Sequence, residues 1–267
     1  GELDSRSSRY SKLGGRRLQP TGDPVTNEQL VALAASIGAC MSALAGFFTV
    51  REISKQRQAT YRPELVPSTT HFSAVPLRFS NSPIPDRWTR PIGLGEDDLL
   101  ALEATMSIEN IGLGAAKRVK VQWDFDIASA ISQANEIAQK SLSAAYFELE
   151  DGILKLKSEG GKDSMSLWKN QTSQEFDYIL PASGKTPSAH ARIPHAYTQI
   201  VAAILYFRNK GESRSFPDDL PILDLMVSYV DIAGAQHSAR YSVKTQVTML
   251  SGKAERFDGY LESSQRI

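Results

Sequence analysis

The chain has 267 residues, 30 of them basic and 30 acidic, so its formal net charge is zero. This balance gives no field that would draw the protein onto nucleic acid, and it argues against a nucleic-acid partner. The single cysteine, Cys40, excludes an intramolecular disulfide and a cysteine-based metal site. No cofactor is predicted from composition.

Residues 1–28 are rich in serine, glycine and arginine and have no apolar periodicity. Such a segment cannot bury enough apolar surface to offset the entropy of ordering it. We therefore expect a disordered tail.

The next segment, 29–60, contains 21 residues from Leu30 to Val50 without a charge. At about 1.5 Å per residue a helix of that length reaches about 31 Å, which is close to the hydrocarbon thickness of a bilayer. Thr26 and Asn27 are suitable helix caps, and Pro63 is the first firm stop. The sequence predicts one N-terminal transmembrane helix that continues into a charged juxtamembrane stalk, Arg51 to Thr60.

Two processing alternatives compete with a retained helix. The sequence Ile37-Gly38-Ala39-Cys40 has the form of a bacterial lipoprotein cleavage box, and Ala43-Leu44-Ala45 has the form of a signal peptidase site. The apolar run continues past both, and acidic Asp23 and Glu28 precede it. Retention is favoured, and cleavage stays as the alternative.

Small side chains recur four residues apart on one side of this helix, a pattern that lets two transmembrane helices approach closely. They form the predicted helix-association face: Ala35, Gly38, Ala39, Ser42, Ala43 and Gly46. The expected partners of this segment are the lipid bilayer and either a second copy of the chain or another transmembrane helix.

Four basic residues, Arg51, Lys55, Arg57 and Arg62, lie within a dozen positions of the C-terminal end of the apolar run. Because positive charge near a membrane helix is retained in the cytoplasm, this bias predicts a single-pass protein of the inner (cell) membrane. Its soluble domain would be cytoplasmic.

Residues 61–267 are predicted to form that soluble domain, beginning with a proline-rich wrap around a strand at 71–80. Three hairpins are expected from alternating apolar residues and turn signals. They are 100–109 with 119–125, 146–150 with 153–157, and 222–231 with 241–250. In the last strand Tyr241, Val243, Val247 and Met249 are expected on one face.

Two helices are predicted between the strands. Ile127, Ile131, Ala134, Ala138 and Leu142 make one helical stripe, and a second helix starts at Pro194 and ends at Gly211. Antiparallel hairpins with inserted helices predict a mainly β fold, an immunoglobulin-like β-sandwich with helical decoration.

Three stretches carry a resemblance: Gln56 to Leu65 directly after the membrane helix, Glu109 to Ala116 before a strand, and Tyr229 to Gly234. In this order they resemble uncharacterised bacterial single-pass, membrane-anchored β-sandwich proteins. The resemblance implies the fold and the anchor and transfers no functional residue.

Two glycine motifs resemble parts of nucleotide-binding sites. Ser183-Gly184-Lys185-Thr186 resembles the end of a phosphate-binding loop, but Ile179 stands where the first glycine is needed. Gly112-Leu113-Gly114 could begin a dinucleotide fingerprint, but Lys117 occupies the third glycine position and a strand follows. A surface turn and a hairpin turn are favoured.

The histidines and the acidic clusters are the residues that could form a metal or catalytic site. His71, His190, His195 and His237 lack the spacing of metal ligands, so no metal site is predicted. The acidic clusters Glu148, Glu150 and Asp151, and Asp218 with Asp219, read as solvated charge, and catalytic residues are not predicted.

We therefore expect a membrane-tethered, non-enzymatic interaction or sensor module that binds a protein or small ligand at the membrane surface. One alternative is a membrane-disrupting oligomeric effector of the bacterial-defence type. Another is a membrane-bound hydrolase, which would need a polar pocket converging on His190, His195 or His237.

Overall fold

The computed structural model describes residues 26–76, 84–85, 87–89, 104–157, 164–168, 172–182, 189–210, 217–251 and 256–266. The chain divides into two compact units, Gly1–Lys55 and Gln56–Ile267. The predicted tail, residues 1–28, lies outside the described residues except for 26–28, and the Ser183–Thr186 motif lies entirely outside them.

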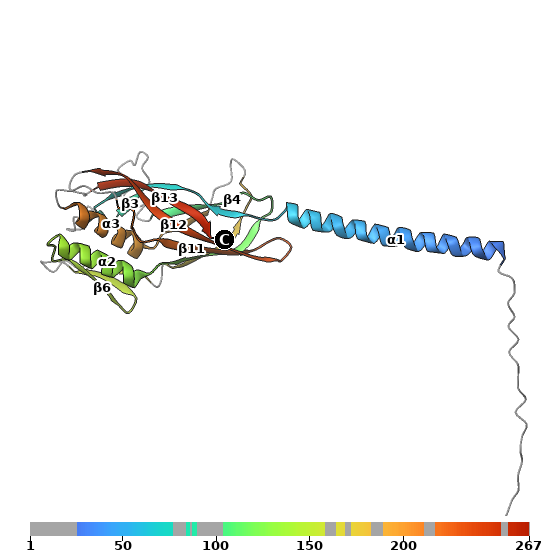
Figure 1. Cartoon of the computed structure of the whole chain (residues 1–267), viewed down its shortest axis with the longest axis horizontal. Coiled ribbons are helices and arrows are strands. Elements are labelled where there is room, and N and C mark those ends of the chain that lie inside the picture. The colour runs from blue at the N-terminus through green and yellow to red at the C-terminus, as the bar shows by residue number, and fades with distance from the viewer. Residues whose placement is uncertain are drawn as a thin grey trace, which may run out of the picture. The chain divides into compact units, whose positions relative to one another are not determined.

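Three helices and thirteen strands are found among the described residues (Figure 1). In chain order they are α1 (Asn27–Thr60), β1 (Leu65–Pro67), β2 (Thr70–Val75), β3 (Arg87–Thr89), β4 (Thr105–Asn110), β5 (Ala116–Asp124), α2 (Ile127–Lys140), β6 (Tyr146–Glu150), β7 (Ile153–Lys157), β8 (Ser164–Leu167), β9 (Ser173–Ile179), β10 (Ala189–Arg192), α3 (His195–Asn209), β11 (Leu223–Val230), β12 (Gln236–Ser251) and β13 (Arg256–Arg266).

Helix α1 has 34 residues, and all of its side chains are exposed within the chain. It is the one helix of the described residues that is long and apolar enough to cross a membrane. Its start at Asn27 and end at Thr60 confirm the predicted uninterrupted helix. This supports a membrane anchor.

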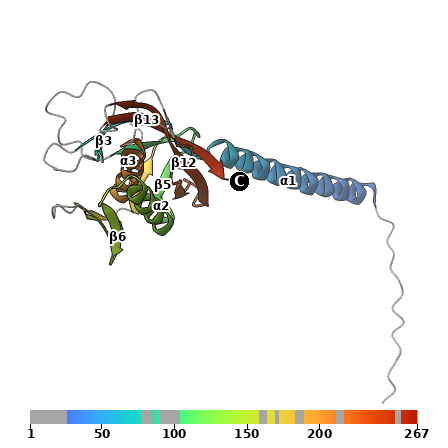
Figure 2. The ribbon, with the colours of Figure 1, turned by 60° about the vertical axis from the view of Figure 1, so that its left-hand side comes forward.

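The second unit is mainly β, as predicted. Its largest sheet is antiparallel and curled, with strand order β3-β2-β13-β12-β11-β5-β9. Two three-stranded sheets, β1-β4-β10 and β6-β7-β8, accompany it. Figure 2 shows α2 and α3 beside the large sheet, with β6 next to α2. The finer expectation of an immunoglobulin-like sandwich stays a prediction.

One predicted hairpin is wrong. Strand β4 pairs with β1 and β10, whereas β5 pairs with β11 and β9, so the two belong to different sheets. The glycine-containing connection, Ile111 to Ala115, carries the chain from one sheet to the other. The alternation of apolar residues identified both strands but not their partners, because pairing depends on residues far away in the sequence.

The other two hairpins are confirmed with small boundary shifts. Asp151 and Gly152 both have positive φ, 52° and 79°, as a two-residue hairpin turn requires. In β12 a bulge between Val247 and Met249 shifts the register against β13. Met249 is consequently 48% exposed while Tyr241 and Val243 are buried, so the prediction that it shares their face is wrong.

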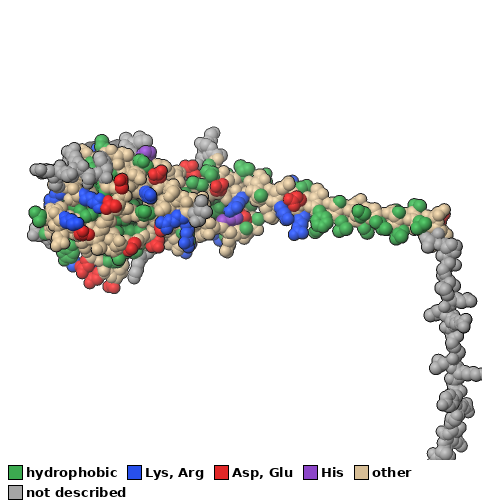
Figure 3. All heavy atoms as spheres, in the orientation of Figure 1, with side chains coloured by type: hydrophobic (Ala, Val, Ile, Leu, Met, Phe, Trp, Pro, Cys, Tyr) green, Lys and Arg blue, Asp and Glu red, His purple; other side chains and the backbone are tan. Residues whose placement is uncertain are grey.

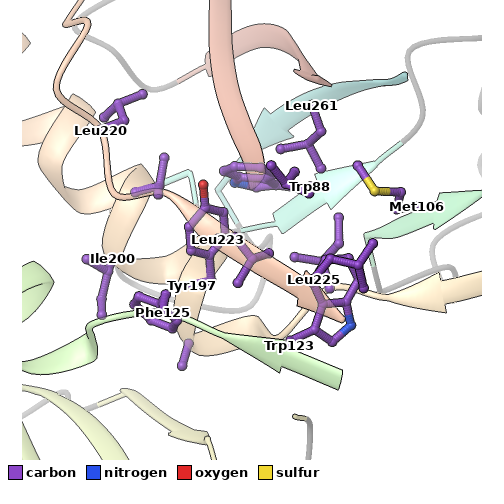
Figure 4. Close-up of a cluster of buried hydrophobic side chains, with 14 of the residues drawn as sticks. Trp88, Met106, Trp123, Phe125, Tyr197, Ile200, Leu220, Leu223, Leu225 and Leu261 are labelled. Carbon is purple, nitrogen blue, oxygen red and sulfur yellow. The ribbon is translucent and has the colours of Figure 1, made fainter. Parts of the chain in front are cut away.

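Helix α3 lies at the centre of the domain. Twelve of its fifteen residues are buried, so it is enclosed on nearly all sides rather than on one face. Tyr197 makes edge contacts with Trp88 and Phe125, and Trp88 stacks on Phe72 with ring centroids 4.0 Å apart (Figure 4). Each fully buried aliphatic side chain in such a core contributes about 1.5–3 kcal/mol.

Helix α2 is amphipathic and covers α3 with a face of small residues. Ala130, Ala134 and Ala138 are buried, and Asp126 caps the helix by accepting from the Ser129 N–H at 3.0 Å. The predicted stripe extended to Leu142, but the helix ends at Lys140. Leu142 is 93% exposed.

Candidate functional site

The predicted helix-association face lies on α1 as expected, and no described residue of the chain covers it. Its six members, from Ala35 to Gly46, are all exposed. A methyl group added at Gly38 or Gly46 would meet nothing within 4 Å. The face is thus open to a neighbouring helix or to lipid.

The predicted basic residues continue from the helix into the domain. Arg51, Lys55 and Arg57 are helical, and Arg62 follows the last turn. Lys55 lies 3.9 Å from Glu52, and both side chains are about 60% exposed. An ion pair this exposed contributes little to stability, so these charges are available to a surface or partner.

Several hydrogen bonds from distant parts of the second unit meet at the segment through which the chain leaves α1. We call residues Tyr61–Pro67 the exit segment. Pro63, Leu65 and Pro67 are buried, and Leu65 to Pro67 form β1, which pairs with β4. The sequence suggested an extended wrap here, and the structure shows instead that this segment is the first strand of the domain.

Side-chain hydroxyls from three adjacent strands bind alternate carbonyls of the exit segment. Tyr229 of β11 donates to the Pro63 carbonyl at 2.9 Å, and Tyr241 of β12 donates to the Leu65 carbonyl at 2.6 Å. A further bond joins the Ser263 hydroxyl of β13 to the Pro67 carbonyl at 2.9 Å. Because successive residues of a strand point to opposite sides, carbonyls two residues apart face the same side. We call these three donors the hydroxyl row.

Burial raises the pKa of both tyrosines in the hydroxyl row, Tyr229 and Tyr241. Both phenols therefore keep their protons at neutral pH and remain donors.

Asn110 fixes the opposite side of the exit segment. Its side-chain amide donates to the carbonyls of Gly114 (2.7 Å) and Ile179 (3.2 Å), and its carbonyl oxygen accepts from the N–H groups of Glu64 and Gly112, both at 3.1 Å. The side chain is almost fully buried, with 1% exposure. One residue thus joins the exit segment, the β4–β5 connection and the end of β9.

The two glycines of the β4–β5 connection allow it to approach the exit segment closely. A Cβ at Gly112 would lie 2.3 Å from the Arg62 carbonyl oxygen, and one at Gly114 would lie 1.8 Å from that of Tyr61. Neither distance is tolerable, so only glycine fits. The motif weighed as a nucleotide fingerprint therefore serves as a backbone contact.

The β11–β12 turn adds a histidine–carboxylate pair beside Tyr229. The Asp231 carboxylate binds His237 Nε2 at 2.9 Å and the N–H groups of Ala233 and Ala235, and the His237 ring stacks on Tyr229 at 5.2 Å. The hydrogen bond from His237 is the main cause that lowers the pKa of Asp231. The pair braces the tyrosine that binds the Pro63 carbonyl.

The other three histidines lie on β10, at the start of α3 and on β2. His190 Nδ1 is 3.1 Å from the Ser107 hydroxyl, across the β4–β10 pair and exposed. His195 begins α3, and His71 of β2 lies against Tyr260. No group of three metal-ligating side chains occurs within the residues that the structure describes.

The acidic clusters form ion pairs rather than paired carboxylates. Glu148 and Glu150 bind Lys157 and Lys155 across the β6–β7 hairpin, and the hydrogen bond from Lys155 is the main cause that lowers the pKa of Glu150. Asp219 receives two bonds from Arg208, at 2.5 and 2.6 Å. These contacts agree with the interpretation of the clusters as surface charge.

The chain matches no protein-family model, no curated protein and no solved structure. Membership of the bacterial membrane-anchored group that the sequence resembles therefore remains a prediction. The interpretation of function depends on the geometry of the chain.

Sequence reasoning did not identify the hydroxyl row, Asn110 or the Asp231–His237 pair. A partial signal existed: Tyr229 falls on the inward face of β11, whose other inward residues, Leu223, Leu225 and Val227, are apolar, and Tyr241 falls beside buried Val243 on β12. A buried tyrosine needs a partner for its hydroxyl, and this requirement predicts a bond without revealing to which segment.

Proposed function

We propose that this protein is a membrane-tethered, non-enzymatic binding module. In this proposal α1 crosses the inner membrane and the β domain presents its surface to a protein or small ligand in the cytoplasm. The immunoglobulin-like character of the domain belongs to the same proposal.

The observation that carries the proposal is the short connection between α1 and the domain, in which Pro63 and Glu64 are hydrogen-bonded to the domain. Four residues, Tyr61 to Glu64, separate the last helical residue from β1. Within them, the Pro63 carbonyl and the Glu64 N–H and carbonyl are all bonded to the domain. A passive anchor works with a loose linker, so this many bonds support a role in which helix and domain act together.

Figure 3 shows apolar side chains along α1 and mixed charges over the domain.

The membrane and sidedness parts of the proposal are tested on the full chain in bacterial cells. Extraction with alkaline carbonate should leave the protein in the membrane pellet. In a Cys40→Ser background, a cysteine at exposed Leu142 should react with an impermeant maleimide only after the cells are permeabilised. Release into the carbonate supernatant would contradict the anchor, and labelling of intact cells would contradict the cytoplasmic side.

The binding part is tested by photocrosslinking in the native membrane. A photoreactive amino acid at exposed Tyr146 or Leu149 should give a discrete adduct with the intact chain. The matched control carries Ile37→Lys and Leu44→Lys in α1, which should abolish insertion and the adduct together. An adduct of equal yield without the anchor would refute a role for tethering, and no discrete adduct at either position would refute binding through this surface.

The second candidate is an oligomeric, membrane-disrupting effector, favoured by the open space beside Gly38 and Gly46. Its test uses two cysteine positions two residues apart, which face nearly opposite sides of a helix. Ser42→Cys in a Cys40→Ser background should form disulfide dimers that native Cys40 does not. Toxicity lost on changing Gly38 and Gly46 to Leu would support the effector, and toxicity unchanged by those substitutions would exclude this face as its cause.

A further inference from the structure

Large exposed apolar side chains gather at the end of the domain where the chain leaves α1. Eleven such residues follow α1 among the described residues, and six of them lie at this end. We call these six the apolar rim: Tyr61, Ile111, Leu113, Tyr178, Leu180 and Ile232. Each is between 47% and 64% exposed.

The strand register places the rim residues together. Lys117 pairs with both Tyr178 and Val230, so β9 and the β11–β12 turn meet the start of β5 at the same end of the sheet. The β4–β5 connection, which carries Ile111 and Leu113, packs on the exit segment through Gly112 and Gly114. The Ile111 N–H also donates to the Glu64 carbonyl at 2.9 Å.

We propose that the apolar rim docks on the membrane surface that α1 enters, with the basic stalk beside it on anionic headgroups. Residues 51–62 carry four basic side chains and one acidic one. Basic charge next to exposed apolar side chains is the pattern of interfacial membrane binding. A second copy of the chain would bring these like charges together, so charge favours lipid over self-association as the occupant of the rim.

The length of the stalk sets a geometric condition. Ten helical residues, Arg51 to Thr60, are about 15 Å long, so the start of the exit segment lies at most about 15 Å from the hydrocarbon edge. Headgroups fill about 5–7 Å of that distance. At a helix tilt of about 40°, the upper end of the usual range, the stalk rises about 11.5 Å and the remaining gap falls to about 4–7 Å, whose lower end a Leu or Ile side chain spans. Docking therefore requires an inclined stalk.

The inference rests on α1 crossing a bilayer and not on the binding role proposed above. It is tested on the full chain, at one chain per lipid nanodisc, in phosphatidylcholine with or without one-quarter phosphatidylglycerol. An environment-sensitive fluorophore is attached at Leu113→Cys or Ile232→Cys in a Cys40→Ser background. The control is Leu142→Cys, which is 93% exposed and follows α2; that helix in turn follows the end of β5 that pairs with the start of β11, away from the β11–β12 turn.

The rim labels should emit at shorter wavelength than the label at Leu142 and be at least threefold less accessible to iodide. They should also be quenched by lipids that carry a nitroxide near the headgroup. Arg57→Glu with Arg62→Glu should reduce the protection in discs that contain phosphatidylglycerol. Equal iodide access at Leu113, Ile232 and Leu142 would overturn the inference. Protection that appears only with two or more chains per disc, without nitroxide quenching, would assign the rim to a second copy and would also overturn it.

Discussion

Replacing Asn110 by alanine removes a side chain whose four hydrogen bonds connect the exit segment, the β4–β5 connection and β9. Two of its four hydrogen bonds, to the carbonyls of Gly114 and Ile179, are buried, and two, from the N–H groups of Glu64 and Gly112, are partly buried. The substitution leaves all four backbone groups without this partner. Asn110→Ala is therefore expected to destabilise the domain rather than to act at a single contact.

The size of the effect follows from the burial of each bond. A typical intramolecular hydrogen bond contributes about 1 kcal/mol, and a buried group left without a partner costs about 1–3 kcal/mol. Water can replace the two partly buried bonds more easily than the two buried ones. The expected loss in the free energy of unfolding is about 3 kcal/mol. With an m-value of about 3 kcal/mol/M, the urea midpoint should fall by about 1 M.

The assay is urea unfolding of the full chain in nanodiscs, followed by tryptophan emission, since all three tryptophans, Trp88, Trp123 and Trp168, belong to the domain. Asn135→Ala is the matched control. Its amide makes only two bonds, both with the Phe147 backbone and both partly buried, so about 1 kcal/mol is expected. If Asn110→Ala lowers the midpoint no more than Asn135→Ala does, the reasoning from bond number and burial is refuted.

Three further substitutions test separate contacts in the same assay. Gly114→Ala should lower the urea midpoint, because its Cβ would overlap a carbonyl of the exit segment. The control Gly38→Ala, with open space around it, should not. Equal effects of the two substitutions would contradict the close approach. Tyr197→Phe should cost about 1–2 kcal/mol, since the hydroxyl bonds both a carbonyl and a threonine in the core, and a neutral result would contradict this. Asp231 has a lowered pKa, so its contribution to stability is present above about pH 3.8, its unperturbed value, and is lost as the pH falls through the folded-state pKa. Asp231→Asn should therefore shrink the difference between midpoints at pH 6 and pH 3, and an unchanged difference would show that the bond to His237 does not produce it.

The features that the sequence predicted correctly have local causes. Helix α1 begins at Asn27, directly after Thr26, and it ends before Pro63 because a residue before proline avoids helical geometry. The β6–β7 hairpin turns at Asp151-Gly152, where both residues must have positive φ. In each case the determining residues lie within a few positions of the feature.

The features that the sequence did not predict depend on distant residues. Asn110 reaches Ile179, 69 positions away, and Tyr229 reaches Pro63, 166 positions away. Nothing near Asn110 in the chain distinguishes it from an ordinary turn asparagine. The same limitation explains the wrong partner assigned to β4, because alternation marks a strand's faces and leaves its neighbours open.

The prolines of the exit segment fit the hydroxyl row for a physical reason. The Pro63, Leu65 and Pro67 carbonyls face one side of the segment, and every partner they meet there is a hydroxyl donor. The Leu65 N–H, on that side, bonds to the Tyr229 hydroxyl oxygen, because a hydroxyl can accept as well as donate. Proline has no N–H, so positions 63 and 67 need no such acceptor, and Pro63 also ends α1. The residues that end the helix are thus the ones that suit a strand bound through its carbonyls, which explains how the chain passes from helix to domain within four residues.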